Sequence, residues 1–169
     1  MKNNWQTKKL GEICLIIAGQ SPEGKFYNKN GRGLPFYQGK KDFGDKFIKE
    51  PTTWTTEITK EAEKDDILMS VRAPVGPINF STQKICIGRG LAAIRATKLI
   101  DKIFLFNFLL KCEKEIVGNT GAVFASITKK DIESLEIAVP SLPEQKRIVK
   151  ILDGVFEKIE KVKENTEKN

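Results

Sequence analysis

Histidine is absent from this chain of 169 residues. The chain therefore lacks the commonest general base, every His-dependent catalytic triad and most ligand sets for transition metals. It also lacks the GxxxxGK[ST] loop that cradles nucleotide phosphates and a GxGxxG motif that opens a helix. Asp65 and Asp66 are adjacent carboxylates, but neighbouring residues of a strand point to opposite faces. We expect no catalysis, no metal site and no bound cofactor in this chain.

Cysteine is scarce, and no apolar run is long enough to span a membrane. Cys14, Cys86 and Cys112 are odd in number and far apart, which argues against a disulfide framework and favours buried free thiols. A spanning helix needs about 18 to 20 consecutive apolar residues, and the opening stretch MKNNWQTKKLGE lacks the apolar core of a signal peptide. We expect a cytoplasmic protein with one domain of about 140 residues and an appendage.

Positive charge is concentrated in the first part of the chain. The net charge is +7, and residues 1–98 hold 17 Lys and Arg against 10 Asp and Glu, whereas residues 99–169 hold 12 of each kind. A localised basic excess is typical of a surface that binds phosphate, and it favours nucleic acid as a partner. The alternative is a basic surface that serves only solubility.

Short apolar runs dominate the middle of the chain. Residues 67–71 are typical of a buried strand, and residues 135–139 alternate with a period of two, as a half-buried strand does. Shorter strands are expected at 78–80, 85–87 and 91–94. Residues 101–116 are long and apolar enough for one buried helix. Thr128 and Asp131 have the spacing of a capping box and predict a brief helical turn.

A long helix is predicted near the end of the sequence. Ser141 and Glu144 have the spacing of a capping box, with Pro143 in the first turn, so the helix begins at residue 142. Its apolar residues recur at intervals of 4, 3, 4 and 3: Ile148, Leu152, Val155, Ile159 and Val162. This a/d seam covers about two heptads, and Gly154 weakens it. Two interpretations stay open, namely pairing with a second helix or folding back on the domain.

Six ordered segments carry a resemblance to a known family. They are KLGEI at 9–13, GQSP at 19–22, PFYQGK at 35–40 with DF at 42–43, DILMSVRAPVG at 66–76, IGRGLAAIR at 87–95 and IAVPSLPEQKRI at 137–148. Together they resemble the specificity subunits of type I restriction-modification systems. The resemblance implies an α/β (α+β) fold, with a mixed, β-rich DNA target-recognition domain over residues 1–140. A long coiled-coil-forming helix for spacing and dimerisation would follow over residues 141–169.

The resemblance also implies partners. Subunits of this family look like two recognition domains, each reading one half of a split DNA target, held apart by two helices. The chain would bind double-stranded DNA and dock two partners. These are a modification subunit that methylates adenine with S-adenosylmethionine, and a restriction subunit that uses ATP and Mg²⁺. With one recognition domain and one helix, it is either a half-subunit that forms a homodimer or half of a longer chain. The alternative class is a non-catalytic assembly module with an incidental basic surface.

Loop residues suited to DNA occur mainly before residue 90. Arg pairs efficiently with guanine and Gln with adenine, whereas Lys and Arg also contact phosphates. The predicted DNA contacts are Lys25, Arg32, Gln38, Lys40, Lys41, Arg72 and Arg89. Arg72 and Arg89 have a second interpretation, as structural or phosphate-binding residues. Trp54 either stacks on a base or is a partly buried core residue. Lys129 and Lys130 either contact phosphate or are solvated.

Overall fold

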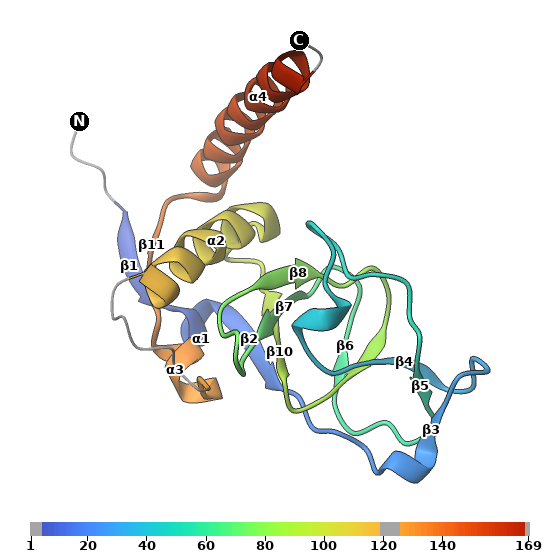
Figure 1. Ribbon diagram of the computed structural model, residues 1–169. Coiled ribbons are helices and arrows are strands. Elements are labelled where there is room, and N and C mark those ends of the chain that lie inside the picture. The colour runs from blue at the N-terminus through green and yellow to red at the C-terminus, as the bar shows by residue number, and fades with distance from the viewer. Residues whose placement is uncertain (1–4, 119–125, 168–169) are drawn as a thin grey trace.

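The computed structural model describes residues 5–118 and 126–167, and it describes their side chains except at 114–118, 160 and 163–167. A β-rich body carries one long helix that projects from it (Figure 1). The α-helices are α1 (Leu10–Ile13), α2 (Lys102–Gly118), α3 (Lys129–Ser134) and α4 (Leu142–Glu167). Two 3-10 turns, η1 (Gly24–Phe26) and η2 (Lys40–Asp42), lie in the loops.

A four-stranded antiparallel sheet packs against α2. Its strands, in spatial order, are β2 (Cys14–Ala18), β10 (Leu91–Ala96), β7 (Ile67–Ser70) and β8 (Ile78–Phe80). All four residues of β7 are buried, and the rings of Phe80 and Phe106 stack with centroids 4.3 Å apart. The Asp101 carboxylate accepts the backbone N–H groups of Ile103 and Phe104, which caps the start of α2. The predicted buried strand and buried helix are therefore confirmed.

A five-stranded sheet forms the other half of the body. Its strands, in spatial order, are β3 (Tyr27–Asn28), β5 (Trp54–Thr55), β4 (Leu34–Tyr37), β9 (Ile85–Ile87) and β6 (Glu61–Ala62). Only the β4–β9 pair is parallel. β9 leads directly into β10 of the first sheet through Gly88, Arg89 and Gly90. The short strands predicted at 78–80, 85–87 and 91–94 are confirmed, and the loop between the last two joins the sheets.

Segments from both ends of the recognition body meet in a two-stranded sheet. β1 (Gln6–Lys9) pairs antiparallel with β11 (Glu136–Val139), where Ile137 is buried and its neighbours are exposed. This confirms the predicted half-buried strand. The capping box before α3 is also confirmed, because the Thr128 side chain accepts from the Asp131 N–H and the Asp131 carboxylate accepts from the Thr128 N–H. The Asp131 carboxylate accepts from the Thr128 hydroxyl as well as from the Thr128 N–H, and these two bonds lower its pKa.

A buried glutamine fixes the start of α4. Gln145 is fully buried, and its Oε1 accepts from the Asp101 N–H at 2.7 Å. Its Nε2 donates to the carbonyls of Pro140 and Leu99. The helix begins at the predicted residue, but the predicted capping box is wrong, because no hydrogen bond of that motif joins Ser141 and Glu144 among the described residues. Both Glu144 oxygens instead accept from Arg147. Residues three apart on a helix are neighbours on its surface, which lets Glu144 and Arg147 form this ion pair.

The apolar seam of α4 lies mostly in solvent. Val155, Ile159 and Val162 are 47%, 45% and 64% exposed, while Ile148 and Leu152 are half-buried. A different face of α4 borders Asp101 and Ile103 at the start of α2; its residues are Lys146, Val149, Lys150, Asp153, Gly154 and Glu157. The first two seam residues are thus partly covered within the single chain, whereas the last three are exposed and accessible to a second helix. Figure 1 shows α4 pointing away from the sheets.

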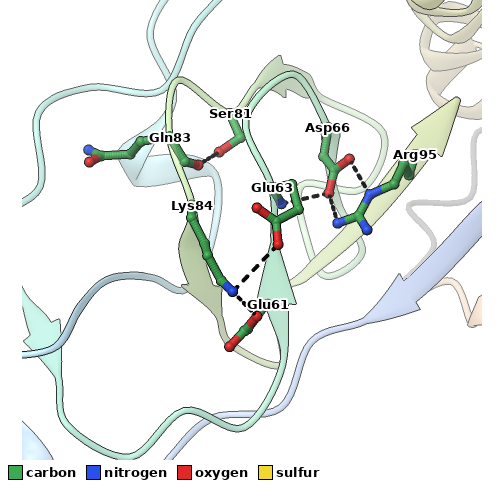
Figure 2. A network of polar contacts seen from close by, with 7 residues as sticks. All are labelled: Glu61, Glu63, Asp66, Ser81, Gln83, Lys84 and Arg95. Atoms are coloured by element: carbon green, nitrogen blue, oxygen red, sulfur yellow. Dashed lines mark hydrogen bonds and ion pairs between the residues drawn. The ribbon is translucent and has the colours of Figure 1, made fainter.

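A buried ion pair joins β10 to the turn before β7 (Figure 2). Asp66 is 2% exposed, and its two oxygens accept from Nε and Nη2 of Arg95, each at 2.8 Å. One of these oxygens also accepts from the Glu63 N–H. The neighbouring Asp65 points elsewhere and pairs with Lys102 at 2.8 Å. The two adjacent carboxylates thus have separate structural partners.

Replacing Arg95 with methionine should lower the free energy of unfolding by about 3 kcal/mol, because the buried Asp66 carboxylate would lose its counter-charge. Asp66→Asn should cost less, about 1 kcal/mol, since the Arg95 side chain is 35% exposed and can turn towards water. Lys84→Met is the matched control, because Lys84 pairs with Glu61 and Glu63 at the surface. Urea unfolding followed by circular dichroism measures all three. Equal losses for Arg95→Met and Lys84→Met would contradict the prediction.

Candidate nucleic-acid interface

Three loops enclose an open recess of about 510 Å³ on the body. They are the loop after β4, the loop after β7 and the turn between β9 and β10. The lining residues are Gln38, Gly39, Lys40, Lys41, Ser70, Arg72, Ala73, Pro74, Arg89 and Gly90. We call this the three-loop recess. Five of the seven DNA contacts predicted from the sequence line it, although they are separated by up to about fifty residues in the chain.

Strand pairing explains why these loops meet. β4 and β9 are parallel, so the loops that follow them leave the sheet at the same edge. β7 and β10 are antiparallel, with Ser70 opposite Leu91, so the end of one strand lies beside the start of the other. Backbone hydrogen bonds link the turn between β9 and β10 to the other two loops. The Gly88 N–H donates to Tyr37 O at 2.8 Å, and the Val71 N–H donates to Gly90 O at 3.0 Å.

The cationic side chains of the three-loop recess have no acidic partner within ion-pair distance among the described residues. Among the described residues, the side chains of Lys40, Lys41, Arg72 and Arg89 form no ion pair, and all four residues are exposed. Charges of one sign that line a concave surface reinforce one another and attract counter-ions. The recess also presents the exposed carboxamide of Gln38, which can donate and accept hydrogen bonds. A phosphate backbone and a base edge match these two features.

A second, smaller recess of about 250 Å³ adjoins the first and shares Arg72 and Arg89 with it. Its far side is formed by Ser126, Ile127, Thr128 and Lys129. Arg72 forms an isolated backbone bridge with Ser126, which brings the segment before α3 against the end of β7. Lys129 is exposed and lies 3.5 Å from Glu133. Lys129 therefore lines the same recess as the two arginines, where a phosphate contact and a solvated lysine are both compatible with its position.

Four residues considered from the sequence lie outside both recesses: Lys25, Arg32, Trp54 and Lys130. Lys25 pairs with Glu23 at 2.6 Å and lies over the Phe26 ring. Arg32 is exposed in the loop between β3 and β4, where its backbone binds the Asn28 side chain. Trp54 is half-buried in β5, opposite Asn28 and Pro35. Lys25 lies in η1 before β3 and Arg32 lies after β3, and both remain predicted contacts outside the recess.

Sequence reasoning overlooked Ser21 altogether. Its Oγ accepts a hydrogen bond from Gln38 Nε2 at 3.3 Å and another from the Arg89 N–H at 3.2 Å. Ser21 lies in the GQSP segment, which contributed to the family resemblance but carries no chemical signal of its own. Only the folded arrangement reveals that this hydroxyl contacts two residues of the three-loop recess.

The three cysteines are buried thiols, as expected. Burial raises the pKa of the Cys14 thiol to about 12, so it stays protonated at neutral pH. Within residues 5–118 and 126–167, no group of three or more His, Cys, Asp or Glu side chains is arranged to hold a metal ion. In the same part of the chain, no helix combines the length and apolarity that a membrane span requires.

The model of the type I restriction-modification DNA specificity domain matches residues 2–168. This chain belongs to that family. A specificity subunit of Methanocaldococcus jannaschii, named for the type I restriction enzyme MjaX, is 46% identical over 98% of the chain. The crystal structure of the HsdS subunit from Thermoanaerobacter tengcongensis is 41% identical over 98% of the chain, with a TM-score of 0.88. The expected family and the mixed, β-rich fold with a C-terminal helix are confirmed.

A solved structure with lower sequence identity has a similar fold. The S subunit from M. genitalium is 17% identical over 95% of the chain, with a TM-score of 0.66, which shows a shared fold alone. This chain spans about 40% of the length of the MjaX relative and of the T. tengcongensis structure.

Proposed function

We propose that this specificity domain recognises one half of a bipartite DNA target for a type I restriction-modification system. The observation that supports this most is the three-loop recess. Four cations that form no ion pair among the described residues line it together with the exposed Gln38. The cations would hold phosphates and set the register on the duplex, while side chains that reach base edges would supply sequence preference. Lys25 and Arg32 would extend the contact outside the recess.

The chemistry of the system would reside on partner subunits. The chain would dock a modification subunit, which methylates adenine with S-adenosylmethionine, and a restriction subunit, which uses ATP and Mg²⁺. Its own role is non-catalytic recognition in the cytoplasm, where the DNA target is found. Absence of histidine from the sequence and absence of a metal-ligating cluster from the described residues are compatible with this division of labour.

Homodimerisation through α4 would supply the second half of the target site. The seam residues Val155, Ile159 and Val162 are exposed apolar side chains at heptad spacing, which is the pattern that pairs two helices. Because one chain spans about 40% of its relatives, two copies would span about 80% of that length. A paired seam would hold two recognition domains apart and let each contact one half-site.

The direct test measures binding of duplex DNA by the chain mixed with its modification subunit. We expect sequence-selective binding. The logarithm of the association constant should fall linearly with the logarithm of the salt concentration, because phosphate contacts release counter-ions. Sequencing of methylated adenines in the host genome should give a motif in two parts separated by a spacer. DNA binding that is insensitive to both salt and the modification subunit would contradict the proposal. It would favour the assembly module with an incidental basic surface.

A further inference from the structure

One hydroxyl group connects two loops of the three-loop recess. Ser21 follows β2, and the Gln20 N–H donates to Ile87 O at 3.0 Å, which lays this segment along the end of β9. On the other side, Tyr27 Oη donates to Pro22 O at 2.9 Å. Ser21 is therefore held between two anchored neighbours. From there its Oγ accepts from both Gln38 Nε2 and the Arg89 N–H.

The turn of Gly88, Arg89 and Gly90 packs directly on Gln38. A Cβ atom added at Gly90 would lie 2.2 Å from Gln38 O, and one at Gly88 would lie 3.0 Å from both Gln38 Cγ and Ser21 Oγ. The Gln38 N–H donates to Asp42 Oδ2 at 3.3 Å. The Gln38 backbone and its side chain as far as Cγ thus have little room to move. The hydrogen bond to Ser21 then sets the orientation of the terminal carboxamide.

The fixed carboxamide keeps the pair of groups that an adenine requires. A glutamine carboxamide has two N–H donors and one carbonyl acceptor, and Ser21 occupies one donor. The second N–H and the carbonyl remain free to form a bidentate pair. In the major groove adenine offers an acceptor at N7 and a donor at N6, which is the complementary pattern.

We propose that Ser21 is a positioning residue that orients the Gln38 carboxamide to read adenine in the major groove. This inference rests on the proposed function and adds a residue and a base to it. A long side chain that is free in solution must be ordered when DNA binds, which weakens discrimination. Ser21 orders Gln38 before binding. Its contribution would therefore appear as base preference at one position, with the electrostatic part of the affinity unchanged.

The experiment uses the chain in complex with its modification subunit. Bound duplexes are selected from a library randomised in the half-site and sequenced, and Gln38→Ala identifies the position that Gln38 reads. The wild type should prefer adenine there about tenfold or more, a preference that Gln38→Ala should remove. Ser21→Ala should reduce it to about threefold or less at that position only, with an unchanged salt dependence. Ser21→Thr, which keeps the hydroxyl, should retain most of it.

Ser134→Ala is the matched control, because it also removes a hydroxyl that forms a local hydrogen bond, here as donor to Asp131 O, but the residue lies in α3, away from the three-loop recess. If Ser21→Ala weakened the base preference equally at every position of the half-site, or changed the salt dependence of the association constant, Ser21 would have a structural role. Either result would overturn the inference. Adenine preference that survives Gln38→Ala would overturn it too, while leaving the proposed function intact. A wild-type complex without any sequence preference would instead overturn the proposed function, and the inference with it.

Discussion

Replacing Val155 and Ile159 of α4 with aspartate should raise the dissociation constant of the homodimer by about 1,000-fold or more. Each dimer would lose four apolar side chains from its seam and gain four facing negative charges. Burial of one such side chain contributes about 1.5–3 kcal/mol, so partial burial of four contributes more than the ~4 kcal/mol that corresponds to 1,000-fold. Because both residues are about half exposed in the single chain, the recognition domain should remain folded.

A matched control for this seam variant is Lys150→Gln with Lys161→Gln. It also lowers the charge of α4 by two, but Lys150 belongs to the face that borders α2 and Lys161 is exposed outside the seam. Sedimentation across a dilution series gives the dissociation constants, and urea unfolding checks the domain. The control should change the constant by less than about threefold. A wild-type chain that stays monomeric, or an aspartate variant that dimerises normally, would contradict the pairing of α4.

Replacing all four cations of the three-loop recess with alanine should weaken DNA binding by about 1,000-fold at moderate salt. Lys40, Lys41, Arg72 and Arg89 line one concave surface without ion pairs among the described residues. A net gain of about 1 kcal/mol for each phosphate contact gives ~4 kcal/mol for the set. The same variant should flatten the slope of log K against log salt by about 3 to 4, since each lost phosphate contact removes about 0.9.

Four exposed lysines outside the recess provide the charge-matched control: Lys64, Lys98, Lys150 and Lys161. Their replacement with alanine lowers the net charge equally and should leave most of the affinity and slope intact. Binding is measured by fluorescence anisotropy of the complex with the modification subunit at several salt concentrations. Equal effects of the two quadruple variants would mean that net charge, rather than the recess, attracts the DNA.

Local patterns in the sequence predicted most of the secondary structure around the site. The apolar run at 67–71, the helix at 101–116 and the alternation at 135–139 all appear in the fold, because each pattern reports on burial of one element. The predicted Ser141–Glu144 capping box failed for a local reason too. Arg147, three residues after Glu144, takes both carboxylate oxygens.

Six ordered segments of the sequence carry the likeness to the family. The basic character, the buried strands and the heptad seam follow from composition and periodicity, which are local properties of the chain. Which loops form one surface depends instead on the tertiary structure. The parallel pairing of β4 with β9 and the antiparallel pairing of β7 with β10 bring Gln38, Arg72 and Arg89 together, and add Ser21. Strand register depends on contacts between distant segments, and no periodicity within one segment encodes which partner it will meet.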